Sequence, residues 1–127
     1  MALSQTNEQA QLYPVICAYV VGSKVAAIGS TVLFPSAPPG VYRVTCCQVI
    51  TTGGTSGTLV TNIIATDDFQ ANTIAVATNA NIATQGQAQG SVIFENTATA
   101  NISFSVVAGG TFGSCVYSLY LILERLF

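Results

Sequence analysis

The sequence predicts an all-β protein, either a jelly roll or a closely related β-sandwich of about eight strands. Short runs rich in β-branched and aromatic residues recur along the chain, separated by clusters of Gly, Ser, Asn and Pro. No segment combines helix caps with a helical hydrophobic period, so the crossover helices that parallel strands require are missing. Strands at this spacing are typical of sandwiches and jelly rolls.

A polar arm is expected to precede a single domain. Residues 1–13 are mostly polar, include three glutamines, and predict an arm or an extended strap. Residues 14–127 then form the β-sandwich, because 127 residues are enough for one core and too few for two. The N-terminus lacks the basic stretch and apolar core of a signal peptide, so we expect none.

The first half of the domain predicts five short strands. They cover residues 15–21, 24–28, 31–34, 41–52 and 58–66. The apolar stretch from Val15 to Phe34 is long enough to suggest a membrane span, but glycine and serine interrupt it twice, so strands are expected. The glycine-rich run at 53–57 lacks the lysine and the following helix of a phosphate loop and predicts a hairpin connection.

The second half predicts four strands, at residues 73–78, 90–96, 101–107 and 114–124, with a polar loop at 79–90. The last strand has two apolar faces. One face carries Cys115, Tyr117, Leu119, Leu121 and Leu123, as expected of a strand over a core. The other face still carries Val116, Tyr120 and Ile122. We therefore expect a sister subunit to cover that second face, with these three residues in the oligomer interface.

The charge content excludes several functions. Charged residues make up 6% of the chain, against about 25% for an average soluble domain. Three basic residues are too few for a nucleic-acid footprint, and the chain has no histidine to serve as general base or metal ligand. A free monomer with so few charges is poorly protected against association. The composition therefore predicts a non-enzymatic subunit of an assembly, with no catalytic residues, cofactor, metal, nucleic-acid partner or membrane partner.

The remaining reactive residues have ordinary structural explanations. Cys17, Cys46, Cys47 and Cys115 are expected to be reduced, and adjacent Cys46 and Cys47 would point to opposite faces of a strand. The pair Asp67-Asp68 predicts a turn cap rather than a calcium site, which needs six to eight oxygens. Arg43 and Glu95 both fall in strand patterns that favour a cross-strand ion pair.

The order of several short motifs resembles that of small β-sandwich proteins encoded among the virion genes of tailed bacteriophages. The likeness covers roughly residues 35–127 and lies in the order and spacing of the motifs. These are Pro39-Gly40-Val41-Tyr42-Arg43-Val44, Thr51-Thr52-Gly53-Gly54, Thr66-Asp67-Asp68, Gln89-Gly90-Ser91-Val92-Ile93-Phe94 and Tyr117-Ser118-Leu119-Tyr120 with Leu123-Glu124-Arg125-Leu126. The resemblance implies a jelly-roll structural protein, commonly a trimer, and transfers no functional residue.

The expected function is therefore that of a capsid decoration, or cement, protein. It would bind the major capsid protein on the virion surface as a homo-oligomer, after assembly in the bacterial cytoplasm. One alternative is a tail, head-fibre or baseplate component. A receptor- or glycan-binding module is an alternative of another class, and a β-sandwich hydrolase is disfavoured by the absence of histidine.

Overall fold

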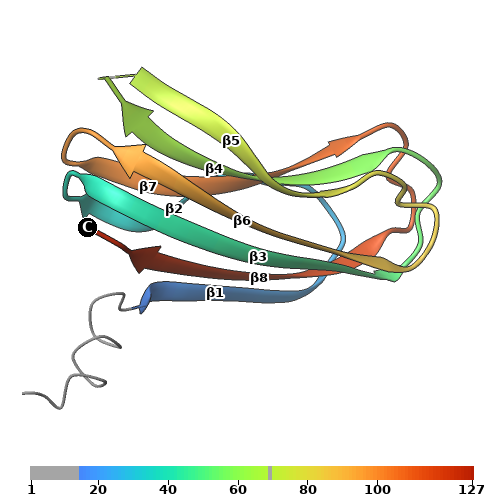
Figure 1. Cartoon of the computed structure of the whole chain (residues 1–127). Coiled ribbons are helices and arrows are strands. Elements are labelled where there is room, and N and C mark those ends of the chain that lie inside the picture. The colour runs from blue at the N-terminus through green and yellow to red at the C-terminus, as the bar shows by residue number, and fades with distance from the viewer. Residues whose placement is uncertain (1–14, 69) are drawn as a thin grey trace, which may run out of the picture.

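Two four-stranded antiparallel sheets pack face to face in the computed structural model, which describes residues 15–68 and 70–127 (Figure 1). The predicted arm at residues 1–13 lies outside the described residues. The eight strands are β1 (Val15–Lys24), β2 (Ile28–Ala37), β3 (Gly40–Thr52), β4 (Thr58–Asp67), β5 (Gln70–Asn79), β6 (Gly86–Asn96), β7 (Ala100–Gly109) and β8 (Val116–Arg125). The described part of the chain contains no helix, and therefore no helix that is long and apolar enough to cross a membrane.

The strand order is that of a jelly roll. The first sheet has the order β1-β8-β3-β6 and the second the order β2-β7-β4-β5. Only β4 and β5 are both consecutive in the chain and neighbours in one sheet, whereas every other connection passes from one sheet to the other. This alternation of the chain between the two sheets confirms the predicted fold class, a jelly roll or related β-sandwich.

Three local predictions were wrong. Residues 24–28 do not form a strand, because β1 continues to Lys24 and residues 25–27 turn toward the second sheet. The predicted loop at 79–90 is strand from Gly86 onward. The glycine-rich run at 53–57 is a crossing between the sheets rather than a hairpin, since β3 and β4 belong to different sheets.

Close backbone packing explains why that crossing is rich in glycine. Gly57 has a φ of 109°, and a Cβ there would collide with the backbone of Gly109. The Gly54 amide donates to the carbonyl of Ile82, and the Ile82 amide donates to the carbonyl of Gly57. Ile82 is fully buried beneath the two loops, so this end of the sandwich is held by backbone bonds around an apolar plug.

The core lies between the sheets and follows the period-two pattern. The predicted inner face of β8 is confirmed, because Cys115, which precedes it, and Tyr117, Leu119, Leu121 and Leu123 are all at most 1% exposed. The second sheet meets it with buried side chains from β4 and β7, namely Leu59, Ile63, Ile102, Phe104 and Val106. Two aromatic contacts join the layers, Tyr19 with Phe104 and Phe34 with Tyr42. Large apolar side chains from both sheets therefore interdigitate across the sandwich.

Two buried amides also cross between the sheets. Gln48 of β3 is fully buried, donates to the carbonyl of Leu59 at 2.9 Å and accepts the Thr61 hydroxyl at 2.6 Å. Asn96 of β6 is also fully buried and bonds to backbone groups near the ends of β2 and β4. Because both side chains are hydrogen-bonded to groups of the second sheet, they fix the relative position of the two sheets without introducing charge.

Candidate interaction surface

The outward side of the first sheet carries Arg43, Glu95 and Glu124 at one end, and we call the broad uncharged area beyond them the open face. Its residues alternate along each strand with buried core residues. It comprises Ala18 and Val20 of β1, Val116, Ser118, Tyr120 and Ile122 of β8, Thr45, Cys47 and Val49 of β3, and Gln87, Gln89 and Ser91 of β6.

One half of the open face is apolar. Val20 is 66% exposed, Tyr120 45% and Ile122 42%, and Val20 lies directly across the β1–β8 ladder from Tyr120. Ala18 is likewise opposite Ile122. The structure therefore brings together the residues that the sequence assigned to the interface, with Val116 half-buried and the other two exposed. That a sister subunit covers them stays a prediction.

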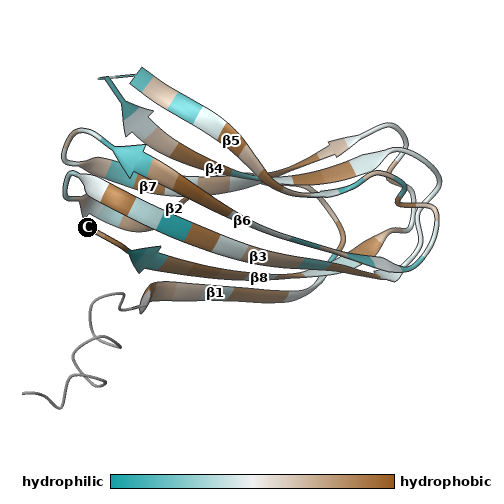
Figure 2. Cartoon of the chain, viewed as in Figure 1, coloured by the Kyte–Doolittle hydropathy of each residue, from teal (hydrophilic) through white to brown (hydrophobic). Residues whose placement is uncertain are grey.

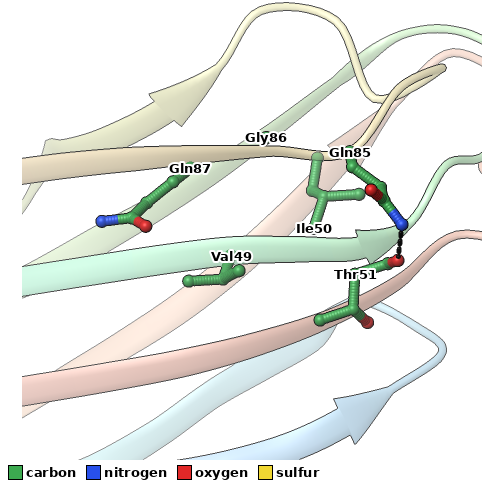
Figure 3. Close-up of a pocket in the computed structure, with 6 residues that line it drawn as sticks. All are labelled: Val49, Ile50, Thr51, Gln85, Gly86 and Gln87. Atoms are coloured by element: carbon green, nitrogen blue, oxygen red, sulfur yellow. Dashed lines mark hydrogen bonds between the residues drawn. The ribbon is translucent and has the colours of Figure 1, made fainter.

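The other half of the open face carries carboxamides and hydroxyls. Gln87 and Gln89 are exposed on β6 opposite Val49 and Cys47 of β3. At the end of these strands lies a shallow depression of about 500 Å³, lined by Val49, Ile50, Thr51, Gln85, Gly86 and Gln87 (Figure 3). The Gln85 amide donates to the Thr51 carbonyl at 2.8 Å across this depression. No charged side chain lines it.

Charged side chains gather at one end of the sandwich. Seven charged residues lie in the described part of the chain, and Lys24 is the one at the opposite end, beside Tyr117. The other six lie where β3 starts and where β4, β6 and β8 finish, namely Arg43, Asp67, Asp68, Glu95, Glu124 and Arg125. Figure 2 shows strongly hydrophilic colour at the arrowheads of β6 and β8 and just beyond that of β4. The middle of both sheets is left without charge.

The Arg43 ion pair forms with the last strand. The Arg43 Nε lies 3.0 Å from a carboxylate oxygen of Glu124, across the β3–β8 ladder. Sequence reasoning named Glu95 as the partner, but Glu95 faces Val41 in the register of β3 and β6. Since the pair is partly exposed, it is worth about 0–1 kcal/mol.

The aspartates at the β4–β5 turn make hydrogen bonds at that end of the sandwich. Asp68 has a φ of 48°, and its amide donates to the Thr97 hydroxyl at 2.8 Å, while Asp67 accepts from Asn72. These contacts bear out the predicted turn role of the pair. Within residues 15–68 and 70–127, no three His, Cys, Asp or Glu side chains lie close enough together to hold a metal ion.

The four cysteines are free thiols, and Cys46 and Cys47 point to opposite faces as predicted. Cys46 and Cys115 are buried, whereas Cys17 and Cys47 are half-buried, so only part of the set behaves as core. Burial raises the pKa of the Cys46 thiol to about 11, although its contact with Thr61 acts in the opposite direction. Burial also raises the pKa of Cys17, Cys115, Tyr42 and Tyr117.

These raised pKa values predict that the protein loses stability in alkaline solution. Above pH 9 a Cys46 thiol in the unfolded chain releases its proton while the folded thiol keeps it until about pH 11. The unfolded state then binds fewer protons, so the free energy of unfolding falls as pH rises through this window, by up to about 1.4 kcal/mol per pH unit for each such group. Urea unfolding at pH 8, 9, 10 and 10.5 under reducing conditions measures this slope.

A variant at Cys46 provides the control for this slope. Cys46→Val keeps an apolar side chain of similar size but has no proton to lose, so its stability should fall less steeply above pH 9. The same slope in wild type and variant would show that other groups cause the loss. A stability that stays constant to pH 10.5 would contradict the prediction.

Sequence reasoning missed the contribution of β6 to the open face. The signal was present, because Gln85, Gln87 and Gln89 alternate with Gly86, Ala88 and Gly90. This is a period of two, but polar and glycine residues have low β propensity, so a loop was predicted. Pairing with β3 along its whole length overrides that local preference.

Comparisons with known proteins support the fold. No protein-family model matches the chain, and no curated protein matches it in sequence. Among solved structures, a chain from the acid-stable capsid of Helicobacter pylori bacteriophage KHP30 is 16% identical, with a TM-score of 0.52. The match covers 90% of this chain and 91% of that one, so the two chains have nearly the same length.

Two further structures match over part of longer chains. One is from the Gx strain of infectious bursal disease virus, with 17% identity, a TM-score of 0.54 and coverage of 86% of this chain and 32% of that one. The other is the Clostridium thermocellum xylanase 10B CBM22-1–GH10 structure complexed with xylohexaose, with 15% identity and a TM-score of 0.51. It covers 89% of this chain and 25% of that one, so the present chain spans about a third and a quarter of these two. Identities this low show a shared jelly-roll fold and nothing more.

Proposed function

We propose that this protein is a structural component of a phage virion, a cement protein that binds the assembled capsid shell as an oligomer and stabilises it. The observation that carries the proposal is the open face, an uncharged sheet surface whose β1–β8 half exposes Val20, Tyr120 and Ile122. A monomer that exposes such a surface gains by covering it. The major capsid protein and a second copy of this chain are the proposed partners.

The size of the open face suits a stable contact. Four strands about 4.8 Å apart and a length of about seven residues at about 3.3 Å each give a flat area of roughly 440 Å². Side-chain relief adds to this figure, and a standard interface buries roughly 800 Å² per partner. One such face can therefore supply most of a specific interface. All but one of the described charged residues lie at one end of the sandwich. A partner that covers the rest of the open face therefore removes few charges from water, and the cost of desolvation stays low.

The match to the KHP30 capsid supports a virion role for a chain of this size. That match spans almost the whole of both chains, so a capsid chain can consist of one jelly roll with little added. The resemblance in motif order to phage virion proteins points the same way. The alternative of a tail, head-fibre or baseplate component shares the fold and differs in where the protein sits on the particle.

Stabilisation by a cement protein follows from mass action. A subunit that binds the assembled shell but not its separated parts lowers the free energy of the shell by RT ln(1 + [L]/Kd), which is about 2.7 kcal/mol per site at a hundredfold excess over Kd. Purified protein added to capsids that lack it should therefore bind at saturable, symmetry-related sites. The temperature at which the capsids open should rise with occupancy.

The decisive measurement is a cryo-EM map of such capsids with and without the protein, paired with thermal release of packaged DNA. The control is Tyr120→Asp, which should bind less and protect less at equal concentration. Density on the tail alone, or binding without any gain in heat resistance, would defeat the cement proposal.

A glycan-binding module is the second candidate, and one observation favours it. The exposed ring of Tyr120 lies on the same face as Gln87, Gln89, Ser91 and Thr45, and aromatic rings beside uncharged hydrogen-bonding groups are suited to sugars. The xylanase match contains a module of the same fold in a complex with xylohexaose. Glycan arrays and calorimetry with xylohexaose would reveal this activity. Saturable glycan binding that Tyr120→Ala abolishes would favour this candidate over the cement role.

A further inference from the structure

The free edge of β6 is unusually regular. Strand β6 pairs with β3 from Gly40↔Asn96 to Ile50↔Gly86, eleven consecutive pairs without a register shift. Within residues 15–68 and 70–127 it is the last strand of the first sheet, so no described strand lies beside its other edge in that sheet. It contains no proline and no charged residue before Glu95. Such an edge presents a row of backbone donors and acceptors to which another strand can add.

The other three edge strands carry features that discourage strand addition. Strand β2 contains Pro35, a positive φ of 50° at Ser36 and three register shifts against β7. Strand β1 has two register shifts against β8 and ends in Lys24. Strand β5 has one shift against β4 and follows the Asp67-Asp68 turn. Bulges, prolines and charges are the usual protections of sheet edges, and β6 alone has none over its first nine residues.

At Gly90, strand β5 approaches β6 from the core side. A Cβ at Gly90 would collide with the carbonyl oxygen of Val76, which is why that position is glycine. Gly90 is paired with Cys46, a core residue, so this contact lies on the inner face of the first sheet. The lateral edge of β6, where an added strand would hydrogen-bond, continues the plane of that sheet.

The sequence before β1 matches this edge in its period. Gln5, Asn7, Gln9 and Gln11 occur at every second position, as Gln85, Gln87 and Gln89 do along β6 and just before it. If residues 4–12 formed a strand beside β6, the two carboxamide rows would lie side by side on the open face. Asn and Gln side chains in neighbouring strands form hydrogen-bonded ladders.

The topology favours a second copy over the same chain as the donor of this strand. Strands β1 and β6 are the opposite edges of one sheet, separated by three strand spacings or about 14 Å. To reach its own β6, the segment before Val15 would use about four to five residues in crossing the end of the sheet. Those residues are Gln11 to Pro14 and their neighbour, which include part of the carboxamide row. A neighbour placed edge to edge receives the whole row.

We propose that residues 4–12 of one copy add as a strand to the free edge of β6 in a second copy. The donor segment precedes β1 at one edge of the sheet and the acceptor is the other edge, so the contact is head-to-tail. Head-to-tail contacts close into rings when the rotation between copies permits it. This exchange supplies a defined contact for the oligomer that the proposed function invokes, and it does not depend on what that oligomer binds.

Cross-linking between two different variants, each with one added cysteine, tests the exchange. Both variants carry Cys47→Ser, because Cys47 lies opposite Gln89 and would compete for it. One adds Gln89→Cys, and the other adds Asn7→Cys, Gln9→Cys or Gln11→Cys, because these three positions cover the strand registers that bring the donor row opposite position 89. After mixing and mild oxidation, at least one donor should give a disulfide-linked dimer of the two variants.

Light scattering across a concentration series gives an independent readout. Removing residues 1–13, or Gln89→Lys, should raise the concentration at half-dissociation at least tenfold. Thr73→Lys, an exposed change on β5, is the matched control and should leave that concentration unchanged. Combining Gln89→Lys with Asn7→Glu, Gln9→Glu or Gln11→Glu, chosen as the position that cross-links to residue 89, should restore the oligomer through an opposite-charge pair.

Three results would overturn the proposal. One is that the two variants form no mixed dimer, while a chain that carries both added cysteines forms the disulfide within itself. That result would assign the segment to its own β6. Another is an oligomer whose half-dissociation concentration is unaffected by removal of residues 1–13. The third is a wild-type monomer at every concentration. An exchanged oligomer that fails to bind capsids would leave the strand exchange in place and overturn only the proposed function.

Discussion

Tyr120→Asp is expected to dissociate the oligomer while leaving the folded subunit intact. Tyr120 is 45% exposed at the centre of the open face, between Val20 of β1 and Cys47 of β3. A carboxylate there is harmless to a free subunit, because water solvates it. In an assembled interface it becomes a buried charge without a partner, which costs on the order of 3–5 kcal/mol. That cost corresponds to a change of more than a hundredfold in the dissociation constant.

Size-exclusion chromatography with light scattering measures the loss of the oligomer, and circular dichroism with urea unfolding measures the fold. Thr73→Asp is the matched control, since it places the same charge at an exposed position of β5 on the second sheet. It should leave the oligomer intact. Dissociation by both variants would point to general charge repulsion, and an oligomer unaffected by Tyr120→Asp would remove the open face from the interface.

The sequence predicted the inner face of β8 well because core residues there alternate without interruption. Leu119, Leu121 and Leu123 are separated by single residues, and a hydrophobic period of two indicates a β-strand with one face on the core. The outer face of the same strand was also identified, since Tyr120 and Ile122 are unusual on a solvated face. Strong local pattern and tertiary environment agree in this strand.

The edge strands were predicted least well. Strand β6 begins Gly-Gln-Ala-Gln-Gly, a composition typical of loops, and becomes a strand because β3 offers eleven regular pairs. The strand predicted at 31–34 stops before Pro35, whereas β2 continues through it, because proline is tolerated on an edge strand where its missing N–H faces away from the ladder. At such positions long-range pairing decides the structure, and pairing cannot be read from a local window.

The ion pair and the buried amides depended on registry between distant strands. Arg43 is 81 residues from Glu124, and only the β3–β8 register places them together. Likewise, alternation along β3 places Gln48 on the core face with Cys46 and Ile50, but nothing in the local sequence identifies the groups that it bonds to on β4. A polar residue on a core face can be predicted from alternation, but its partners cannot.

Asn96→Asp is expected to cause the largest loss of stability from a single-atom change. The Asn96 side chain is fully buried and donates to the carbonyls of Ala37 at 3.1 Å and Ala98 at 2.8 Å. Its oxygen accepts the amide of Thr66 at 3.1 Å. One amide therefore ties the end of β2 to the end of β4 and closes the turn after β6. An ionised aspartate keeps the bond to Thr66 but turns an acceptor toward two carbonyl oxygens.

The expected cost at pH 7 is about 3–5 kcal/mol, because a buried charge remains without a donor on that side. This is a large part of the roughly 5–15 kcal/mol that stabilises an ordinary domain. Burial and the facing carbonyls should raise the pKa of the new carboxyl above that of an unfolded aspartate. The variant should therefore regain stability as pH falls from 7 toward 4, since the protonated acid can donate to one carbonyl.

Urea unfolding at pH 7 and pH 4 measures both effects, with Asn81→Asp as the matched control. Asn81 is exposed and uses only its side-chain oxygen, which accepts the Ala83 amide at 2.9 Å, so an aspartate preserves that bond. Its stability should stay within about 0.5 kcal/mol of wild type at pH 7. A similarly small effect of Asn96→Asp, or one that does not diminish in acid, would show that this amide does not hold the ends of the two sheets together.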